Sequence, residues 1–93
     1  MKYLAVSTNT KDVSPFIVAE FRRLDELRAA GTITGGWAKA DVSGAVLVLE
    51  CVDAAEATAA LNALPSAINN ATTFALTAIV DLDSGVTQRL LRR

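Results

Sequence analysis

The segment 45–51, AVLVLEC, is apolar at every position except Glu50. A short run of this kind predicts a β-strand. Because neighbouring residues of a strand point to opposite faces of the sheet, both faces of this strand are apolar. Residues 72–82 show the same property, since Phe74 and Leu76 alternate with Ala75 and Ile79. A sheet built from such strands needs cover on both faces, and this requirement constrains the fold more than any other feature.

Two further segments, residues 3–8 and 32–40, also have strand character. The turn 41–44 links residues 32–40 to residues 45–51, and this short connection predicts a β-hairpin. Gly35 and Gly36 interrupt the first strand of that hairpin, which indicates a bulge or a close approach of another backbone.

The remaining segments predict helices. Ser14 and Pro15 predict a helix start, and Gly31 is placed where a C-terminal cap is expected. The apolar stripe of this helix consists of Ile17, Phe21, Leu24 and Leu27. A second helix begins with the capping box formed by Asp53 and Glu56, and Pro65 ends it before a loop at 66–71. A short tail helix over residues 84–93 ends in Arg89, Arg92 and Arg93.

The order β-α-β-β-α-β predicts a ferredoxin-like α+β fold. We expect one domain over residues 1–93, with a four-stranded antiparallel sheet and both helices on one face. The sequence offers no further helices for the other face, so a second copy of the chain is the obvious cover. Two sheets facing each other would form a dimeric α+β barrel with an enclosed cavity. A homodimer or a higher homo-oligomer is therefore expected.

Composition excludes several functional classes. The chain has no histidine, so histidine-dependent catalytic triads are excluded and a zinc site is not expected. The net charge of −1 gives no overall attraction for nucleic acid or for an anionic membrane. The single cysteine, Cys51, suits a reducing compartment, and no segment predicts a signal peptide or a membrane span. We therefore expect a cytoplasmic protein.

Residues 27–61, LRAAGTITGGWAKADVSGAVLVLECVDAAEATAAL, resemble muconolactone isomerase and its relatives among the dimeric α+β barrel proteins. The matching features are Gly31 followed by Thr32, Trp37 in the second strand and Glu50 at the end of the third. An acid-capped second helix and the pair Leu64–Pro65 then follow. The resemblance implies a small organic acid or an aromatic-derived substrate, no metal, no cofactor and an oligomer of at least two chains.

Four residues are candidates for a site. Trp37 and Lys39 share one face of their strand, where they would form an aromatic wall and a cation for a substrate carboxylate, or a dimer contact with lysine at its rim. Glu50 would act as a general acid or base, or would be a strand-end carboxylate in solvent. Tyr3 would donate a hydrogen bond into the cavity, or would be an interfacial ring. Cys51 alternates with Glu50 and is expected to face the helices.

Three functions are compatible with these residues and with what the resemblance implies. The first is a cofactor-free isomerase that moves a proton on a small organic acid or lactone, with Glu50 as the catalytic residue. The second is a non-catalytic barrel that binds a small molecule or serves as an oligomeric module. The third is a cofactor-independent monooxygenase on the same fold.

Overall fold

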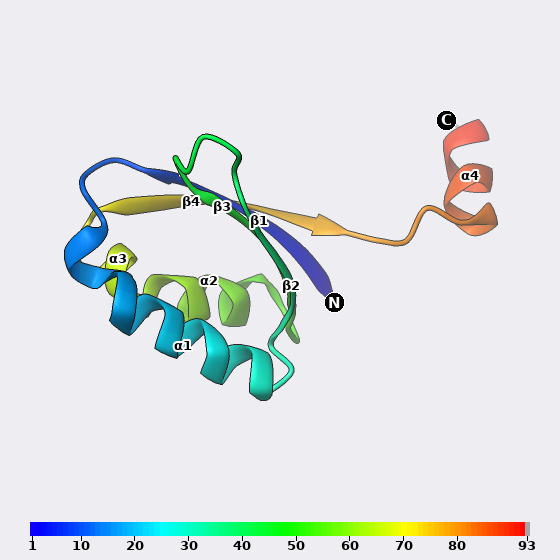
Figure 1. Cartoon of the computed structure of the whole chain (residues 1–93). Helices are drawn as coiled ribbons and strands as arrows, with labels where there is room; N and C mark the ends of the chain where they lie inside the picture. The colour runs from blue at the N-terminus through cyan, green and yellow to red at the C-terminus, as the bar shows by residue number, and fades with distance from the viewer. Residues whose placement is uncertain (93) are drawn as a thin grey trace.

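A four-stranded antiparallel sheet forms the centre of the computed structural model, which describes residues 1–92. Its strands are β1 (Lys2–Asn9), β2 (Ile33–Ala38), β3 (Ala45–Glu50) and β4 (Thr72–Ile79), in the spatial order β2-β3-β1-β4. The helical elements are η1 (Ser14–Phe16), α1 (Ile17–Ala29), α2 (Ala54–Asn62), α3 (Pro65–Ile68) and α4 (Ser84–Leu91). Helices α1, α2 and α3 lie on one side of the sheet (Figure 1). This arrangement confirms the predicted ferredoxin-like α+β fold.

Strand register assigns each residue to a face of the sheet. Leu4 lies opposite Val48 on β3 and opposite Thr77 on β4, and residues that lie opposite one another share a face. The face turned away from the helices, called the open face below, carries the following side chains: Lys2, Leu4, Val6, Thr8, Trp37, Val46, Val48, Glu50, Thr73, Ala75, Thr77 and Ile79. Its centre is apolar, and none of α1, α2 and α3 covers it.

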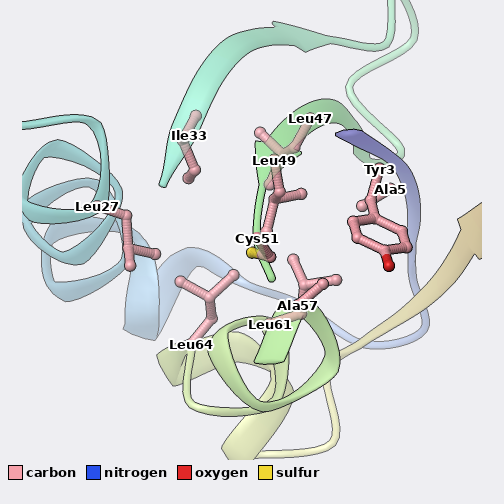
Figure 2. Packing of buried hydrophobic residues seen from close by; sticks show 10 residues of the cluster. All are labelled: Tyr3, Ala5, Leu27, Ile33, Leu47, Leu49, Cys51, Ala57, Leu61 and Leu64. Carbon is pink, nitrogen blue, oxygen red and sulfur yellow. The ribbon is translucent and has the colours of Figure 1, made fainter. Parts of the chain in front are cut away.

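The hydrophobic core lies between the sheet and its helices (Figure 2). Ile33, Leu49 and Leu64 are its largest fully buried side chains. Cys51 belongs to the same cluster, which confirms the prediction that it faces the helices. Burial raises the pKa of the Cys51 thiol, with a smaller contribution from the nearby Glu56 carboxylate.

Two predicted caps are present. Gly31 has φ +80°, and the Thr32 N–H beyond it donates to the Leu27 carbonyl at 2.9 Å, which closes the end of α1. The Asp53 carboxylate accepts from the Glu56 N–H at 2.8 Å at the start of α2. Glu56 reaches back to the N–H of Val52, so the capping box closes one residue earlier than in its usual form.

Two predicted helix boundaries were wrong. Ser14 does not cap α1, because its N–H and hydroxyl both donate to Asp12 Oδ1, at 3.0 and 2.6 Å, and the 3₁₀ turn η1 intervenes. Pro65 does not simply end α2. It is the first residue of α3, where the fixed φ of proline suits the helix and the missing N–H has no cost. The first part of the predicted loop 66–71 is therefore helical.

The C-terminal segment extends away from the body. Strand β4 ends at Ile79, before the predicted boundary at residue 82, and an extended segment leads to α4 (Figure 1). The Asp83 carboxylate caps α4 by accepting from the Val86 N–H at 3.1 Å. The molecule measures 49 × 27 × 21 Å along its principal axes, and the predicted tail-helix residue Arg93 is outside the described residues.

Candidate functional site

A cavity of about 470 Å³ lies between α1 and the helix-covered face of the sheet. Its walls are mainly apolar, and they include Phe16, Ile17, Phe21, Leu24, Ala45 and Leu47. Pockets that bind small molecules enclose about 300–1,000 Å³ and have mainly apolar walls with a few polar groups. The cavity therefore has the size and the lining of a small-molecule site.

The cavity exists because only the C-terminal half of α1 packs closely on the core. Leu27 is 6% exposed, whereas Phe21, earlier in the same apolar stripe, is 59% exposed and borders the cavity. The sheet presents small residues to this space, among them Gly36 and Ala38 of β2. Short side chains opposite a helix leave a volume that the core side chains do not fill. The apolar stripe of α1 is thus part core and part cavity wall.

Glu20 of α1 places a carboxylate in the cavity wall. Its Oε1 accepts from the Ser66 N–H at 3.1 Å, and its Oε2 accepts from the Ser66 hydroxyl at 2.5 Å. Ser66 is 2% exposed, and its N–H belongs to the first turn of α3, where Leu64 provides no side-chain cap. This contact fixes the orientation of the carboxylate. Each oxygen can still accept another hydrogen bond, so a ligand hydroxyl could donate to Glu20.

Arg28 contributes the cationic group of the cavity lining. Its Nη1 lies 3.3 Å from Asp25 Oδ1 in an exposed ion pair. A Cβ added at Gly36 would lie 3.7 Å from Arg28 Nη2, so the guanidinium reaches from α1 towards β2. A cation in this position can attract a carboxylate or an oxyanion of a ligand.

Other polar groups at the cavity are satisfied within the chain. The Ser7 hydroxyl accepts from the Ala45 N–H at 2.7 Å, and the Thr72 hydroxyl donates to Asn9 Oδ1 at 3.0 Å. Among the described residues, no buried side-chain nitrogen or oxygen lacks a hydrogen-bond partner. Apolar contact and the Glu20 carboxylate are therefore the main means of recognition that this cavity offers.

Trp37 and Lys39 lie together on the open face, as their spacing predicts. The Trp37 indole is 62% exposed and lies over Gly35, where an added Cβ would be 3.1 Å from Cη2 of the ring. Lys39 Nζ donates to the hydroxyl of Thr8 on the same face at 3.4 Å. The register of β2 against β3 shifts between Ile33 and Gly35, next to the glycine pair where a bulge or a close backbone approach was predicted. Trp37 also borders the cavity, because β2 is the edge strand beside α1.

Glu50 is at the far end of the open face. It lies opposite Lys2, whereas Trp37 lies opposite Val46, and the four residue steps from Val46 to Glu50 correspond to about 13 Å along β3. Glu50 Oε1 pairs with the N-terminal amine at 3.2 Å, and a hollow of about 240 Å³ adjoins it. Within one chain, Glu50 does not meet Trp37 and Lys39.

Tyr3 lies on the other side of the sheet. It is 5% exposed and belongs to the core cluster beneath the helices (Figure 2). The four residues predicted from the sequence therefore occupy three separate places: the Trp37 and Lys39 pair, the Glu50 end of the open face, and the core.

Glu20 and Ser66 were not singled out by the sequence patterns. A signal for Glu20 was present, because it follows Ile17 by three residues and precedes Leu24 by four, so it shares their face of the helix. A carboxylate in an apolar stripe is a candidate for a site. Ser66 gave no comparable signal, since its contact with Glu20 joins two distant parts of the chain.

Within residues 1–92, no three or more acidic or cysteine side chains are grouped in a way that could hold a metal ion. In the same part of the chain, every helix is too short or too polar to cross a membrane.

Comparison with known proteins shows the fold. No family model matches the chain, and no curated protein matches it. Among solved structures, it is similar to 5-chloro-2-hydroxyhydroquinone dehydrochlorinase from Burkholderia phenoliruptrix AC1100, solved in complex with 2,5-dihydroxybenzoquinone. The TM-score is 0.74 at 15% sequence identity, over 86% of this chain and 94% of the other. What the two chains share is the α+β fold with a four-stranded antiparallel sheet.

Proposed function

We propose that this chain binds a small hydroxylated ring compound in the cavity between α1 and the sheet, and that Glu20 exchanges a proton with it. The observation that carries this proposal is a mainly apolar cavity of about 470 Å³ with a carboxylate fixed in its wall by Ser66. A general base must lie within hydrogen-bond reach of the proton it takes, and Glu20 is the carboxylate that borders this space.

The lining favours a ring as the ligand. Phe16 and Phe21 offer aromatic faces, against which a planar ring can pack edge-on or offset. A ring hydroxyl would donate to Glu20, and an oxyanion or carboxylate would pair with Arg28. The dehydrochlorinase of similar fold was solved with 2,5-dihydroxybenzoquinone, which is also a small hydroxylated ring. The two lines of support agree on the class of ligand.

Proton transfer at Glu20 is compatible with the isomerase expected from the resemblance. The carboxylate would take a proton from a carbon beside a carbonyl group and return it at another carbon, so that a double bond moves and nothing is oxidised or reduced. A small lactone or organic acid could be such a substrate. As the resemblance implies, this chemistry would need no cofactor.

We also propose that a second copy of the chain covers the open face. Leu4, Val6, Val46 and Val48 form an apolar centre that no helix of the described chain covers. In that assembly Trp37, Lys39 and Glu50 would line the space between two sheets. Their proposed roles as ligand-binding and proton-transferring groups then belong to the assembled barrel rather than to one chain.

A titration of the wild-type protein with catechol and with 2,5-dihydroxybenzoquinone, followed by calorimetry, tests the binding proposal. We expect both compounds to bind, and Glu20→Gln to weaken catechol at least about tenfold, because the catechol hydroxyl loses a hydrogen bond to a charged group. Glu26→Gln is the matched control. It removes the same charge from α1, but Glu26 pairs with Arg23 in solvent.

Equal binding by the wild-type protein and Glu20→Gln would contradict the role of Glu20. If neither compound nor a wider set of lactones and ring acids binds, the cavity proposal fails and the oligomeric-module function is favoured. Turnover of a bound lactone by the wild-type protein, but not by Glu20→Gln, would support the isomerase. Oxygen consumption with catechol would instead support the monooxygenase.

A further inference from the structure

Val42, in the loop between β2 and β3, has φ +55°. Among the described residues, it shares a positive φ with only one other non-glycine residue, Asn70. Asparagine tolerates this left-handed conformation, whereas a β-branched side chain in it is a clear outlier and is strained. The loop therefore holds valine in a conformation that glycine, asparagine or aspartate would adopt more easily.

Hydrogen bonds within the loop impose this conformation. The Val42 N–H donates to the Lys39 carbonyl at 2.8 Å, and the Lys39 N–H donates to the Gly44 carbonyl at 2.9 Å. Asp41 Oδ1 accepts from the N–H and the hydroxyl of Ser43, at 3.0 and 2.6 Å. The turn is thus closed on both sides of Val42.

The loop is also attached to β1. The Asn9 N–H donates to the Ser43 carbonyl at 2.7 Å, and Asn9 Nδ2 donates to the Val42 carbonyl at 3.4 Å. Gly44 lies so close to β1 that an added Cβ would be 2.0 Å from the Ser7 carbonyl oxygen. These contacts leave the backbone of Val42 little freedom to relax its strain.

The side chain of Val42 gains little within its own chain in return. It is 76% exposed, yet it borders the same cavity as Glu20. Strain of this kind persists where the surroundings enforce it, and it concentrates at ligand-binding sites. Since the free chain leaves the isopropyl group largely exposed, burial within the chain does little to offset the strain.

We propose that Val42 is a specificity-determining residue whose isopropyl group packs on a ring bound in the cavity. This inference rests on the proposed function, and it adds a second contact between the ligand and the chain, besides the one with Glu20. The ring presents an apolar edge to Val42 and a hydroxyl to Glu20. Ligands with a charged or strongly hydrated group at the apolar edge are rejected, because the valine offers that group no hydrogen bond.

The test is Val42→Asn, with Val42→Gly as a second variant, because both residues suit a positive φ and neither offers the apolar side chain. We expect the unfolding temperature of Val42→Asn to equal or exceed that of the wild-type protein. Its affinity for catechol should fall about fivefold to tenfold, since the burial of the two valine methyl groups is lost. The matched control is Asn70→Gly, which changes the other positive-φ site, outside the cavity lining, and should leave affinity unchanged.

If the wild-type protein binds catechol and Val42→Asn binds it with the same affinity, the role of Val42 is overturned and the proposed function stands. No binding of catechol or of 2,5-dihydroxybenzoquinone by the wild-type protein would overturn both. A clearly lower unfolding temperature of both variants would show that the isopropyl group already packs in the free protein. If the variants sediment as a smaller assembly than the wild-type protein, Val42 belongs to an interface between copies, and its proposed role in ligand binding is overturned.

Discussion

Glu20 and Glu50 are the same residue type in different surroundings. Glu50 ends an apolar strand, but its carboxylate pairs with the N-terminal amine at a solvent-exposed edge. Glu20 lies beside the apolar stripe of α1, between Ile17 and Leu24, and a buried serine fixes both of its oxygens beside a cavity. The strand pattern made Glu50 conspicuous in the sequence. The contact that orients Glu20 comes from Ser66, far along the chain, and such a contact leaves no comparable pattern in the sequence. This is why the sequence favoured Glu50.

Ser66→Ala should destabilise the protein, because it removes the buried hydroxyl that donates to the Glu20 carboxylate. A hydrogen bond to a charged group contributes about 1.5–3 kcal/mol, and urea unfolding would measure the loss. Ser14→Ala is the control, since that hydroxyl donates to Asp12 at an exposed site and should contribute less. A loss no larger than that of the control would mean that the contact with Ser66 does not hold Glu20.

Cys51 should react slowly with a thiol reagent in the native protein and quickly in urea. Burial restricts access to the thiol and raises its pKa, so less thiolate is present at a given pH. The same shift should lower stability as the pH rises above the ordinary value of 9.0, because the unfolded thiol then loses its proton while the folded thiol keeps it. Fast native labelling would show that Cys51, the residue after β3, is turned towards solvent.

At the scale of elements, the strands and long helices were predictable because their periodicity is local. The apolar run of β3, the Gly31 cap and the Asp53 cap each depend on a few neighbouring residues. The errors at Ser14 and Pro65 arose where two local patterns competed. Asp12 took the hydrogen bonds of Ser14, and proline suits a helix start as well as a helix end.

The cavity could not be predicted from local pattern. Its volume depends on how far the N-terminal half of α1 lies from the sheet, and the long-range packing of Leu27, Ile33 and Leu64 fixes this separation. The stripe from Ile17 to Leu27 looks uniform in the sequence, although only its last part is buried. Trp37 and Lys39 were grouped correctly because strand alternation alone places them on one face.

Gly35→Ala should move the Trp37 indole, because the added Cβ would lie 3.1 and 3.3 Å from two of its ring carbons. We expect a shift of the tryptophan emission maximum to longer wavelength as the ring leaves Gly35 for solvent. Gly36→Ala is the matched control on the same strand, since its Cβ would meet a Leu47 methyl carbon at 3.2 Å rather than the indole. Identical emission from the wild-type protein and Gly35→Ala would show that the ring is not held over Gly35.

At the scale of the whole molecule, two features are incomplete in one chain. The centre of the open face is apolar and has no helix over it, and α4 extends away from the body (Figure 1). Helix α4 has eight residues, and isolated helices of that length are marginal in water. Leu90 and Leu91 on it are exposed. A second copy could cover the open face and also provide packing for α4.

Sedimentation of dilute wild-type protein should therefore show at least a dimer, and Val46→Lys should weaken it. Val46 lies at the apolar centre of the open face between Val6 and Trp37, so a lysine there places a charge where two sheets would meet. Stable interfaces bury about 1,200–2,000 Å² in total, and a lysine at the centre of such an interface would bury a charge without a partner. Val18→Lys is the control, because Val18 is already exposed on α1 and does not belong to the open face. A folded wild-type monomer at micromolar concentration would contradict the dimer, and a dimer unaffected by Val46→Lys would place the interface elsewhere. Either result would leave Trp37, Lys39 and Glu50 without an enclosed site.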